Sequence, residues 1–203
     1  VERLTRRGDY VLDPFCGRGT TPFQALLMGR RAVASDINPV AYCVTRAKTN
    51  APSIASVRRR LTSLEREFKT NAWEDHRKQL PPFFRWAYSP ATLRQVVYLR
   101  SRLRWSDSDV DCFIAALTLG SLHGESSISP SYLSNQMPRT ISTKPAYSIK
   151  FWKERGLRPP VRDAIELLRK QLDYRFESEP PKGRAIVWQM DMRELPRAKR
   201  MLP

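Results

Sequence analysis

The sequence predicts an α/β fold in which parallel strands alternate with helices. Two short apolar stretches, 10–12 and 31–36, flank a glycine-rich turn and a segment with helical character. A third apolar stretch, 185–190, lies far downstream. Each stretch ends at or beside an aspartate, and runs of this length suit strands buried in a parallel sheet. The order is therefore strand, turn, helix and strand, with a third strand added after a long insertion.

The turn after the first strand is Gly17-Arg18-Gly19. Glycine permits positive φ and a close approach of the backbone to a ligand, so a ligand is expected here. Thr20 and Thr21 follow and are expected to cap the helix. A dinucleotide fingerprint would place a third glycine where this chain has Pro22, which disfavours a pyrophosphate. A structural turn without a ligand is the alternative.

Two carboxylates flank this turn and favour a cationic ligand. Asp36 closes the second strand nineteen residues after Gly17, near the spacing at which an acidic side chain reaches a ribose hydroxyl. Asp13 closes the first strand, where it would repel a pyrophosphate but attract a cation. S-adenosylmethionine (AdoMet) carries a sulfonium and an ammonium group, so these residues favour AdoMet over NAD.

Three segments resemble a known family. Asp13-Pro14-Phe15-Cys16-Gly17-Arg18-Gly19-Thr20-Thr21 resembles the AdoMet-binding motif of the DNA amino-methyltransferases, which modify N4 of cytosine or N6 of adenine. Ser35-Asp36-Ile37-Asn38-Pro39 is similar to their ribose-binding motif, and Asp191 with the residues up to Pro196 resembles the motif that contacts adenine. The cofactor-binding residues that the resemblance implies are Asp13, Pro14, Phe15, Cys16, Gly17, Gly19, Thr20, Asp36, Ile37, Asn38 and Asp191.

The resemblance implies a Rossmann-like, AdoMet-dependent methyltransferase fold with a partial sheet and a large helical insertion. Residues 1–50 and 184–203 are expected to form the incomplete AdoMet-binding core, and residues 51–183 the insertion. For Asp191 an ordinary turn or a helix cap stays open. Cys16 lies inside the cofactor loop, so it is not expected to act as a nucleophile.

The catalytic motif of this family is absent from the sequence. That motif is Asp, Asn or Ser followed by Pro-Pro and an aromatic residue, which stacks on a flipped base. Leu80-Pro81-Pro82-Phe83, Arg158-Pro159-Pro160-Val161 and Glu179-Pro180-Pro181-Lys182 each fail to match it and are expected to be linkers or helix entries. The catalytic residues are therefore unknown. In the family the missing strand pairs with the first strand, so we expect that edge to be open to a complementing chain or a missing C-terminal half.

The insertion has the spacing of amphipathic helices. Apolar residues recur at three and four positions in 57–68, 90–105, 107–123 and 160–176, which predicts four helices. A polar and basic loop is expected at 124–150, with hydroxyl, amide and cationic side chains suited to phosphates and bases. Its nucleic-acid candidates are Arg139, Lys144, Tyr147 and Lys150, and a plain solvated loop is the alternative.

Composition narrows the function classes further. The 203 residues include 36 basic and 20 acidic ones, a net charge of +16 that favours a nucleic-acid partner. Three cysteines without a CxxC pair suit a reducing compartment. Two histidines are too few for a histidine-rich metal site, so no metal is expected. Signal and membrane-spanning patterns are absent. We expect a cytoplasmic, nucleoid-associated protein.

These observations predict an AdoMet-dependent methyltransferase that acts on an exocyclic amino group of a DNA base, as in restriction–modification. The methyl group would pass by direct displacement, and this chain alone would be inactive because the catalytic motif is absent. An RNA guanine-N2 methyltransferase is one alternative, because it shares the Asp-Pro-Phe-Cys-Gly motif. The other is a non-catalytic subunit or remnant that binds AdoMet or DNA.

Overall fold

The computed structural model describes residues 1–124, 132–135 and 144–195 of the chain. Its contacts divide the chain into two compact units, which we describe separately. Residues 104–116 lie within the insertion expected at 51–183, but their contacts place them in unit 1. Unit 1 comprises Val1–Val57, Arg104–Ala116 and Phe176–Pro203, and unit 2 comprises Arg58–Leu103 and Leu117–Arg175.

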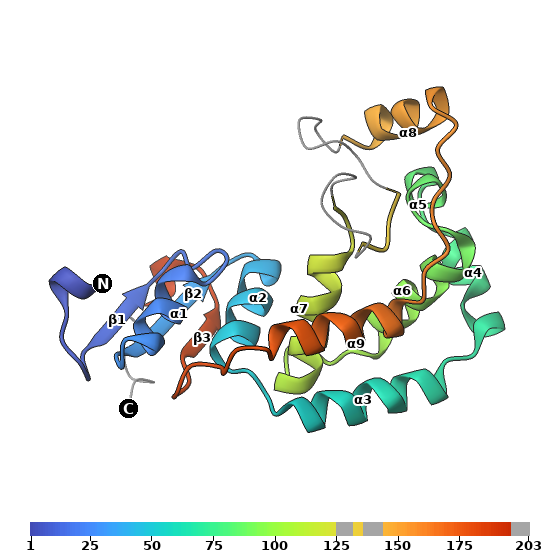
Figure 1. Ribbon diagram of the computed structural model, residues 1–203. Coiled ribbons are helices and arrows are strands. Elements are labelled where there is room, and N and C mark those ends of the chain that lie inside the picture. The colour runs from blue at the N-terminus through green and yellow to red at the C-terminus, as the bar shows by residue number, and fades with distance from the viewer. Residues whose placement is uncertain (125–131, 136–143, 196–203) are drawn as a thin grey trace. The chain divides into compact units, whose positions relative to one another are not determined.

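Unit 1 is built on a parallel sheet of three strands in the order β1-β2-β3 (Figure 1). The strands are β1 (Tyr10–Asp13), β2 (Arg31–Asp36) and β3 (Ile186–Gln189). In the register, Val33 of the central strand is the partner of Leu12 on one side and of Ile186 on the other. The predicted α/β class and all three predicted strands are confirmed, although β3 is shorter than the stretch 185–190.

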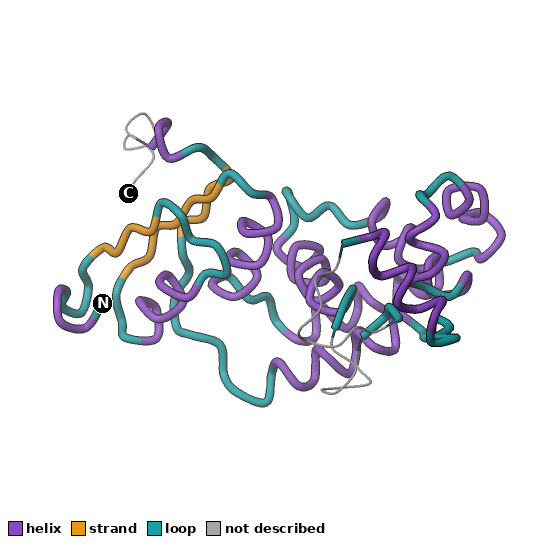
Figure 2. The backbone as a smooth tube through the Cα atoms, turned by 90° about the horizontal axis from the view of Figure 1, so that it is seen from above, coloured by secondary structure: helices purple, strands orange, loops and turns teal. Residues whose placement is uncertain are grey.

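Two helices pack on the sheet, and Figure 2 shows both on the same face. They are α1 (Thr20–Leu27) and α2 (Pro39–Thr49). The Asn38 side chain caps α2 by accepting a hydrogen bond from the Val40 N–H at 2.9 Å. The small core beneath the helices consists of Ala25, Leu26, Ala32 and Ala185, with Val11 and Val187 packed against it.

The first helix begins differently from the prediction. Gly19, not a threonine, occupies the N-cap position of α1, with φ of 74° and no side chain to accept a hydrogen bond. Thr20 and Thr21 already lie in the first turn, so the prediction that they cap the helix is wrong. The physical reason is the left-handed backbone at Gly19, which turns the chain directly into the helix.

Among the described residues, β1 is an edge strand, and the sheet face opposite α1 and α2 is exposed at this strand. β1 has β2 as its one strand neighbour there. Tyr10 and Leu12 project from the face opposite the two helices and are 43% and 56% exposed. Parallel sheets are normally covered on both faces, so this apolar face is unusual for a free surface.

The described part of unit 2 is helical. The helices in its range include α4 (Glu74–Lys78), α5 (Pro82–Ala87), α6 (Pro90–Arg102), α8 (Pro145–Glu154) and α9 (Ala164–Arg175), while α3 (Ile54–Glu67) and α7 (Asp109–Ser121) extend into it from unit 1. Unit 2 also contains the short 3₁₀ turn η2 (Thr70–Trp73), whereas the turns η1 (Glu2–Leu4) and η3 (Met192–Glu194) belong to unit 1. No helix of the described residues has the length and apolarity to cross a membrane.

The four predicted helices are confirmed as α3, α6, α7 and α9, with ends shifted by a few residues. Three further helices, α4, α5 and α8, were not predicted. Pro82 begins α5, which agrees with the helix-entry role expected for one Pro-Pro pair. The expected loop at 124–150 is wrong at its end, because Pro145 begins α8 and Ser148, Phe151 and Trp152 bury one face of that helix.

Candidate functional site

The candidate site lies where the three parallel strands end. Asp13 and Asp36 are the last residues of β1 and β2, and Asp191 lies two residues beyond the end of β3. The strands are parallel and adjacent, so their carboxyl ends meet at one edge of the sheet (Figure 1). The fold therefore brings three acidic side chains from distant parts of the sequence to one edge.

The glycine turn at this edge has a defined backbone. Gly17 and Gly19 have φ of 50° and 74°, the left-handed region expected for the turn. The Gly19 N–H donates to the Cys16 carbonyl at 2.7 Å, and the Cys16 N–H donates to the Ser35 carbonyl at 3.0 Å. These bonds close the turn on itself and anchor it to the end of β2.

Asp36 holds the turn through its carboxylate. One oxygen accepts a hydrogen bond from the Gly17 N–H and the other from the Asn38 N–H, both at 2.9 Å. Each oxygen keeps a further lone pair, so both remain able to accept from a ribose hydroxyl. Asp13 accepts one hydrogen bond from the Phe15 N–H at 3.2 Å. The two carboxylates are thus oriented by backbone N–H groups before a ligand arrives.

Helix α2 supports the turn from below through two residues that the sequence analysis missed. Thr45 Oγ1 donates to the Gly17 carbonyl at 3.3 Å, and Lys48 Nζ donates to the Arg18 carbonyl at 2.6 Å. A Cβ atom on Gly19 would lie 2.8 Å from Thr45 Oγ1 and 3.0 Å from Thr45 Cα. Thr45 and Lys48 lie six and nine residues after Pro39, and nothing in that spacing identifies them as supports of the turn.

Asp191 is engaged locally. It caps η3 by accepting from the Arg193 N–H at 2.9 Å, and its carboxylate pairs with the Arg193 guanidinium at 2.6 Å. The Arg193 hydrogen bonds lower the pKa of Asp191 to about 2. The helix-cap alternative from the sequence is therefore what the structure contains, and a role toward a ligand stays a prediction.

The other residues implied by the resemblance divide into loop supports and exposed positions. Pro14 accepts a hydrogen bond from Ser35 Oγ at 3.3 Å, and Asn38 caps α2. Thr20 is exposed at the first position of α1. Cys16 is buried, and burial raises the pKa of its thiol. A buried thiol with a raised pKa is a poor nucleophile, which agrees with the expected packing role.

Apolar side chains surround the carboxylates. Phe15, Ile37 and Met192 follow the strand-end acids and are 69%, 67% and 41% exposed. Met192 was not among the predicted residues. A Cβ atom on Gly17 would meet only the Phe15 carbonyl oxygen within 4 Å, at 3.9 Å, so the turn is open on its outer side. Acidic acceptors, apolar side chains and an open backbone fit a cationic cofactor with an adenosine moiety.

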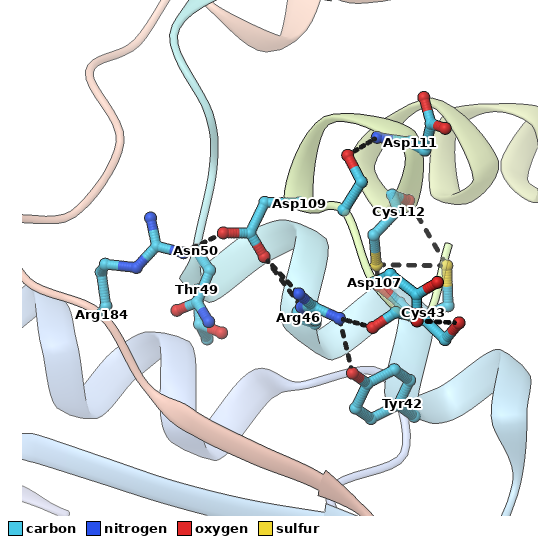
Figure 3. Close-up of polar contacts among 12 residues, drawn as sticks. Tyr42, Cys43, Arg46, Thr49, Asn50, Asp107, Asp109, Asp111, Cys112 and Arg184 are labelled. Carbon is cyan, nitrogen blue, oxygen red and sulfur yellow. Dashed lines mark hydrogen bonds and ion pairs between the residues drawn. The ribbon is translucent and has the colours of Figure 1, made fainter. Parts of the chain in front are cut away.

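A second polar cluster joins α2 to the segment 106–112 and to Arg184 (Figure 3). Arg46 binds Asp109 at 2.8 Å, the Tyr42 hydroxyl at 2.7 Å and the Ser106 carbonyl at 2.6 Å. Asp109 also pairs with Arg184, just before β3. Beside it, the buried sulfur atoms of Cys43 and Cys112 lie 3.6 Å apart as thiols. No group of side chains that could hold a metal ion occurs in the described part of the chain.

The nucleic-acid candidates are only partly described. Arg139 lies outside the described residues. Lys144 precedes α8, and Tyr147 and Lys150 follow at three-residue spacing along its exposed face. Lys150 Nζ lies 3.7 Å from a carboxylate oxygen of Glu154. Lys144, Tyr147 and Lys150 are therefore accessible on one helical face.

Other polar residues of the expected loop are buried. Ser134, Asn135 and Ser148 all have almost no exposed surface. The Asn135 side chain donates to the carbonyls of Trp86 and Leu157, both at 3.4 Å. Asn135 therefore joins segments of unit 2, so this amide of the expected phosphate- and base-binding loop has an internal role.

Comparison with known proteins identifies one matching segment. Residues 1–46 match the DNA methylase family. The match spans β1, the glycine turn, β2 and most of α2, so the family predicted for these motifs is confirmed there. It supports a DNA methylase in general terms, and hence a methyltransferase. No curated protein and no solved structure matches the chain.

Proposed function

We propose that this chain is the AdoMet-binding portion of a Rossmann-like methyltransferase that modifies an exocyclic amino group of a DNA base, N6 of adenine or N4 of cytosine. The observation that carries the proposal is the glycine turn held between two strand-end carboxylates, inside the segment that matches the DNA methylase family. A restriction–modification system in the cytoplasm, on the nucleoid, is the setting that fits this activity.

Charge and shape support a proposed role for each group at the sheet edge. Asp13 beside the turn would attract the ammonium of the methionine moiety, because opposite charges at short range favour one another. Asp36 would accept hydrogen bonds from the ribose hydroxyls with its free lone pairs. Asp191 would accept from the adenine amino group, and the apolar Ile37 and Met192 would pack against the adenine ring.

The chemistry fits direct displacement. AdoMet, when bound, supplies a methyl group activated by its sulfonium. The residues of this chain would bind and orient the cofactor, and orientation alone accounts for a large share of such a rate enhancement. Cys16 takes no part as a nucleophile, because its thiol is buried and its pKa is raised.

DNA is the partner that the charge distribution favours. Unit 2 carries 21 basic and 9 acidic residues, and unit 1 carries 15 and 11, so most of the excess positive charge belongs to unit 2. A cationic surface binds phosphates in a salt-dependent way. Lys144, Tyr147 and Lys150 on α8 would contact the DNA, with the lysines on phosphates and the tyrosine available for stacking.

The part of this sheet face at β1 supports a complementing segment, because Leu12 is 56% exposed whereas its register partner Val33 is buried. Leu12, Val33 and Ile186 are register partners in one row across the three strands, on the face without described helices. We propose that a further strand pairs with the edge of β1 and brings the catalytic Pro-Pro-aromatic motif, which the sequence of this chain lacks. Methyl transfer would then require a segment that carries this motif in addition to the residues of this chain.

Titration calorimetry and a radiolabel assay test the function in two steps. The chain should bind AdoMet, and Asp36→Ala should weaken the affinity, because the turn and the ribose hydroxyls both lose an acceptor. Absence of AdoMet binding would contradict the proposal. Methyl transfer from labelled AdoMet is then measured on duplex DNA and on tRNA, with this chain alone and with the full product of its gene.

The transfer assay separates the alternatives. Labelled DNA with the full product, but not with this chain alone, supports the proposal. Labelled tRNA would favour an RNA guanine-N2 methyltransferase instead. Binding of AdoMet without transfer by either protein would favour the non-catalytic subunit or remnant.

A further inference from the structure

Asn50 joins two segments of unit 1 that lie far apart in the sequence. It follows the last residue of α2, and its backbone N–H still donates to the Arg46 carbonyl at 2.8 Å. Its side-chain amide donates to the Ala185 carbonyl at 3.1 Å and accepts from the Ala185 N–H at 2.9 Å. Asn50 therefore pairs both backbone groups of one residue, as a neighbouring peptide group does in a sheet.

The residue that Asn50 holds lies directly before β3. Ala185 is buried in the core of unit 1, and the ladder between β2 and β3 begins at the next residue, with Ile186 opposite Val33. A second contact fixes the preceding residue, because the Arg184 guanidinium pairs with Asp109, which also binds Arg46 on α2 (Figure 3). The entry into β3 is thus tied to the end of α2 at two consecutive residues.

The strand itself specifies its register weakly. β3 has four residues, of which Ile186, Val187 and Trp188 are all partly buried, so its two faces differ little in burial. Register is firmly set where one face of a strand is buried and the other exposed, and weakly set otherwise. The two hydrogen bonds between Asn50 and Ala185 therefore have a strong influence on the register of β3.

Register at β3 determines the position of Asp191. A slip by one residue would move every later residue by about 3.3 Å and reverse the face of each strand side chain. We propose that Asn50 is a positioning residue that fixes the register of β3 and thereby holds Asp191 at the carboxyl edge, where it meets the adenine of AdoMet. The ligand part of this inference rests on the proposed function, whereas the register part does not.

Hydrogen exchange and a double-mutant cycle test both parts on the full chain. Asn50→Ala should increase exchange at the amides of Ile186–Gln189. It should also weaken AdoMet binding by about tenfold, the effect of losing the one hydrogen bond proposed between Asp191 and the adenine. Asp191→Ala should weaken binding to a similar extent. In the Asp191→Ala background, Asn50→Ala should change the affinity by less than about twofold, because the group it positions is already absent.

Two further variants complete the design. Asn71→Ala removes an exposed asparagine from η2 in unit 2 and should change neither exchange in β3 nor AdoMet affinity. Asn50→Asp keeps the acceptor for the Ala185 N–H but loses the donor for its carbonyl. Its exchange should exceed that of the wild type, because a carboxylate oxygen would face the Ala185 carbonyl oxygen, and it provides a second comparison if N50A does not fold.

The possible results are distinguishable. Unchanged exchange at Ile186–Gln189 in N50A overturns the register role. If N50A increases exchange but lowers AdoMet affinity equally in the wild-type and D191A backgrounds, the inference that Asn50 acts through Asp191 is overturned. If the wild type does not bind AdoMet, the proposed function and the ligand part fail together, while the exchange data still decide the register part.

Discussion

The two units differ in charge and in the way their polar groups are used. Unit 1 has 15 basic and 11 acidic residues, and its Asp13 and Asp36 are oriented by backbone N–H groups around an open glycine turn. Unit 2 has 21 basic residues against 9 acidic ones, and its described secondary structure consists of helices joined by loops. One chain thus separates acceptors that suit a cation from donors that suit a polyanion. A substitution in one unit should leave the ligand of the other unaffected.

The largest expected effect comes from Gly19→Ala in unit 1. The new Cβ would lie 3.0 Å from the Thr45 backbone, at a φ of 74° that L side chains rarely adopt. Such strain costs about 1–3 kcal/mol, and a turn displaced to relieve it should bind AdoMet about a hundredfold more weakly. Calorimetry measures the affinity, and DNA binding should remain.

Gly8→Ala is the matched control for that substitution. Gly8 also has positive φ, 88°, but a Cβ there would meet nothing within 4 Å. It should reduce stability without changing AdoMet affinity. Equal losses of affinity in both variants would contradict a specific contact between the turn and α2.

The next effect concerns the exposed lysines of unit 2. Lys144→Glu with Lys150→Glu should weaken duplex DNA binding about tenfold at moderate salt and reduce the slope of log K against log salt by about two, because two phosphate contacts are lost. AdoMet affinity should not change. Fluorescence anisotropy at several salt concentrations gives the slope.

Arg3→Glu with Lys182→Glu makes the same change of charge at exposed positions of unit 1. If this pair weakens DNA binding as much as the α8 pair does, the net charge of the chain acts on DNA and the separation between units is lost.

A smaller effect is expected within unit 2 from Asn135→Ala. Its buried side chain bonds the Trp86 and Leu157 carbonyls, which would be left without this donor. The free energy of unfolding should fall by about 1–3 kcal/mol. Urea denaturation measures it, with exposed Asn71→Ala as control. Increased exchange in β1 and β2 would show that the two units do not respond separately.

The smallest effect is a pH dependence in unit 2. Arg77, and then Arg94, hold the pKa of Glu74 at about 2, below its ordinary value of 4.5. A carboxyl group with a lowered pKa in the folded state stabilises it above pH 4.5, and this stabilisation is lost as the pH falls toward 2. Glu74→Gln should therefore be less stable than the wild type at pH 7, and the difference should vanish near pH 2. Thermal midpoints of both proteins, measured from pH 7 to pH 2, give this difference. A difference that stays constant over that pH range would contradict the ion pairs.

Local patterns predicted the elements that local forces determine. The strand 31–36 was predicted with its observed bounds, because the apolar residues 32–34 lie between Gly29 and Asp36. The glycine turn and Asp36 were likewise evident from spacing. The start of α1 was predicted wrongly, since a threonine after a glycine turn is a plausible cap until the backbone angle of Gly19 is known.

Contacts between residues far apart in the sequence could not be predicted from sequence patterns. Nothing near Asn50 indicates that it will bind Ala185, and nothing near Asn135 indicates burial in preference to contact with DNA. Helix α8 was missed because a polar composition suggested a loop, whereas its stability comes from burying Phe151 and Trp152. The candidate site was predictable as a set of strand ends, but its supports were not.

The contact between Asn50 and Ala185 also bears on how the chain folds as it is made. The two residues are 135 positions apart, and all of unit 2 is synthesised between them. At ribosomal rates of about 5–20 residues per second, β1 and β2 wait on the order of ten seconds for their third strand. During that interval β2 lacks its partner β3 at one edge. Unit 1 therefore starts to be synthesised before unit 2 but is completed after it.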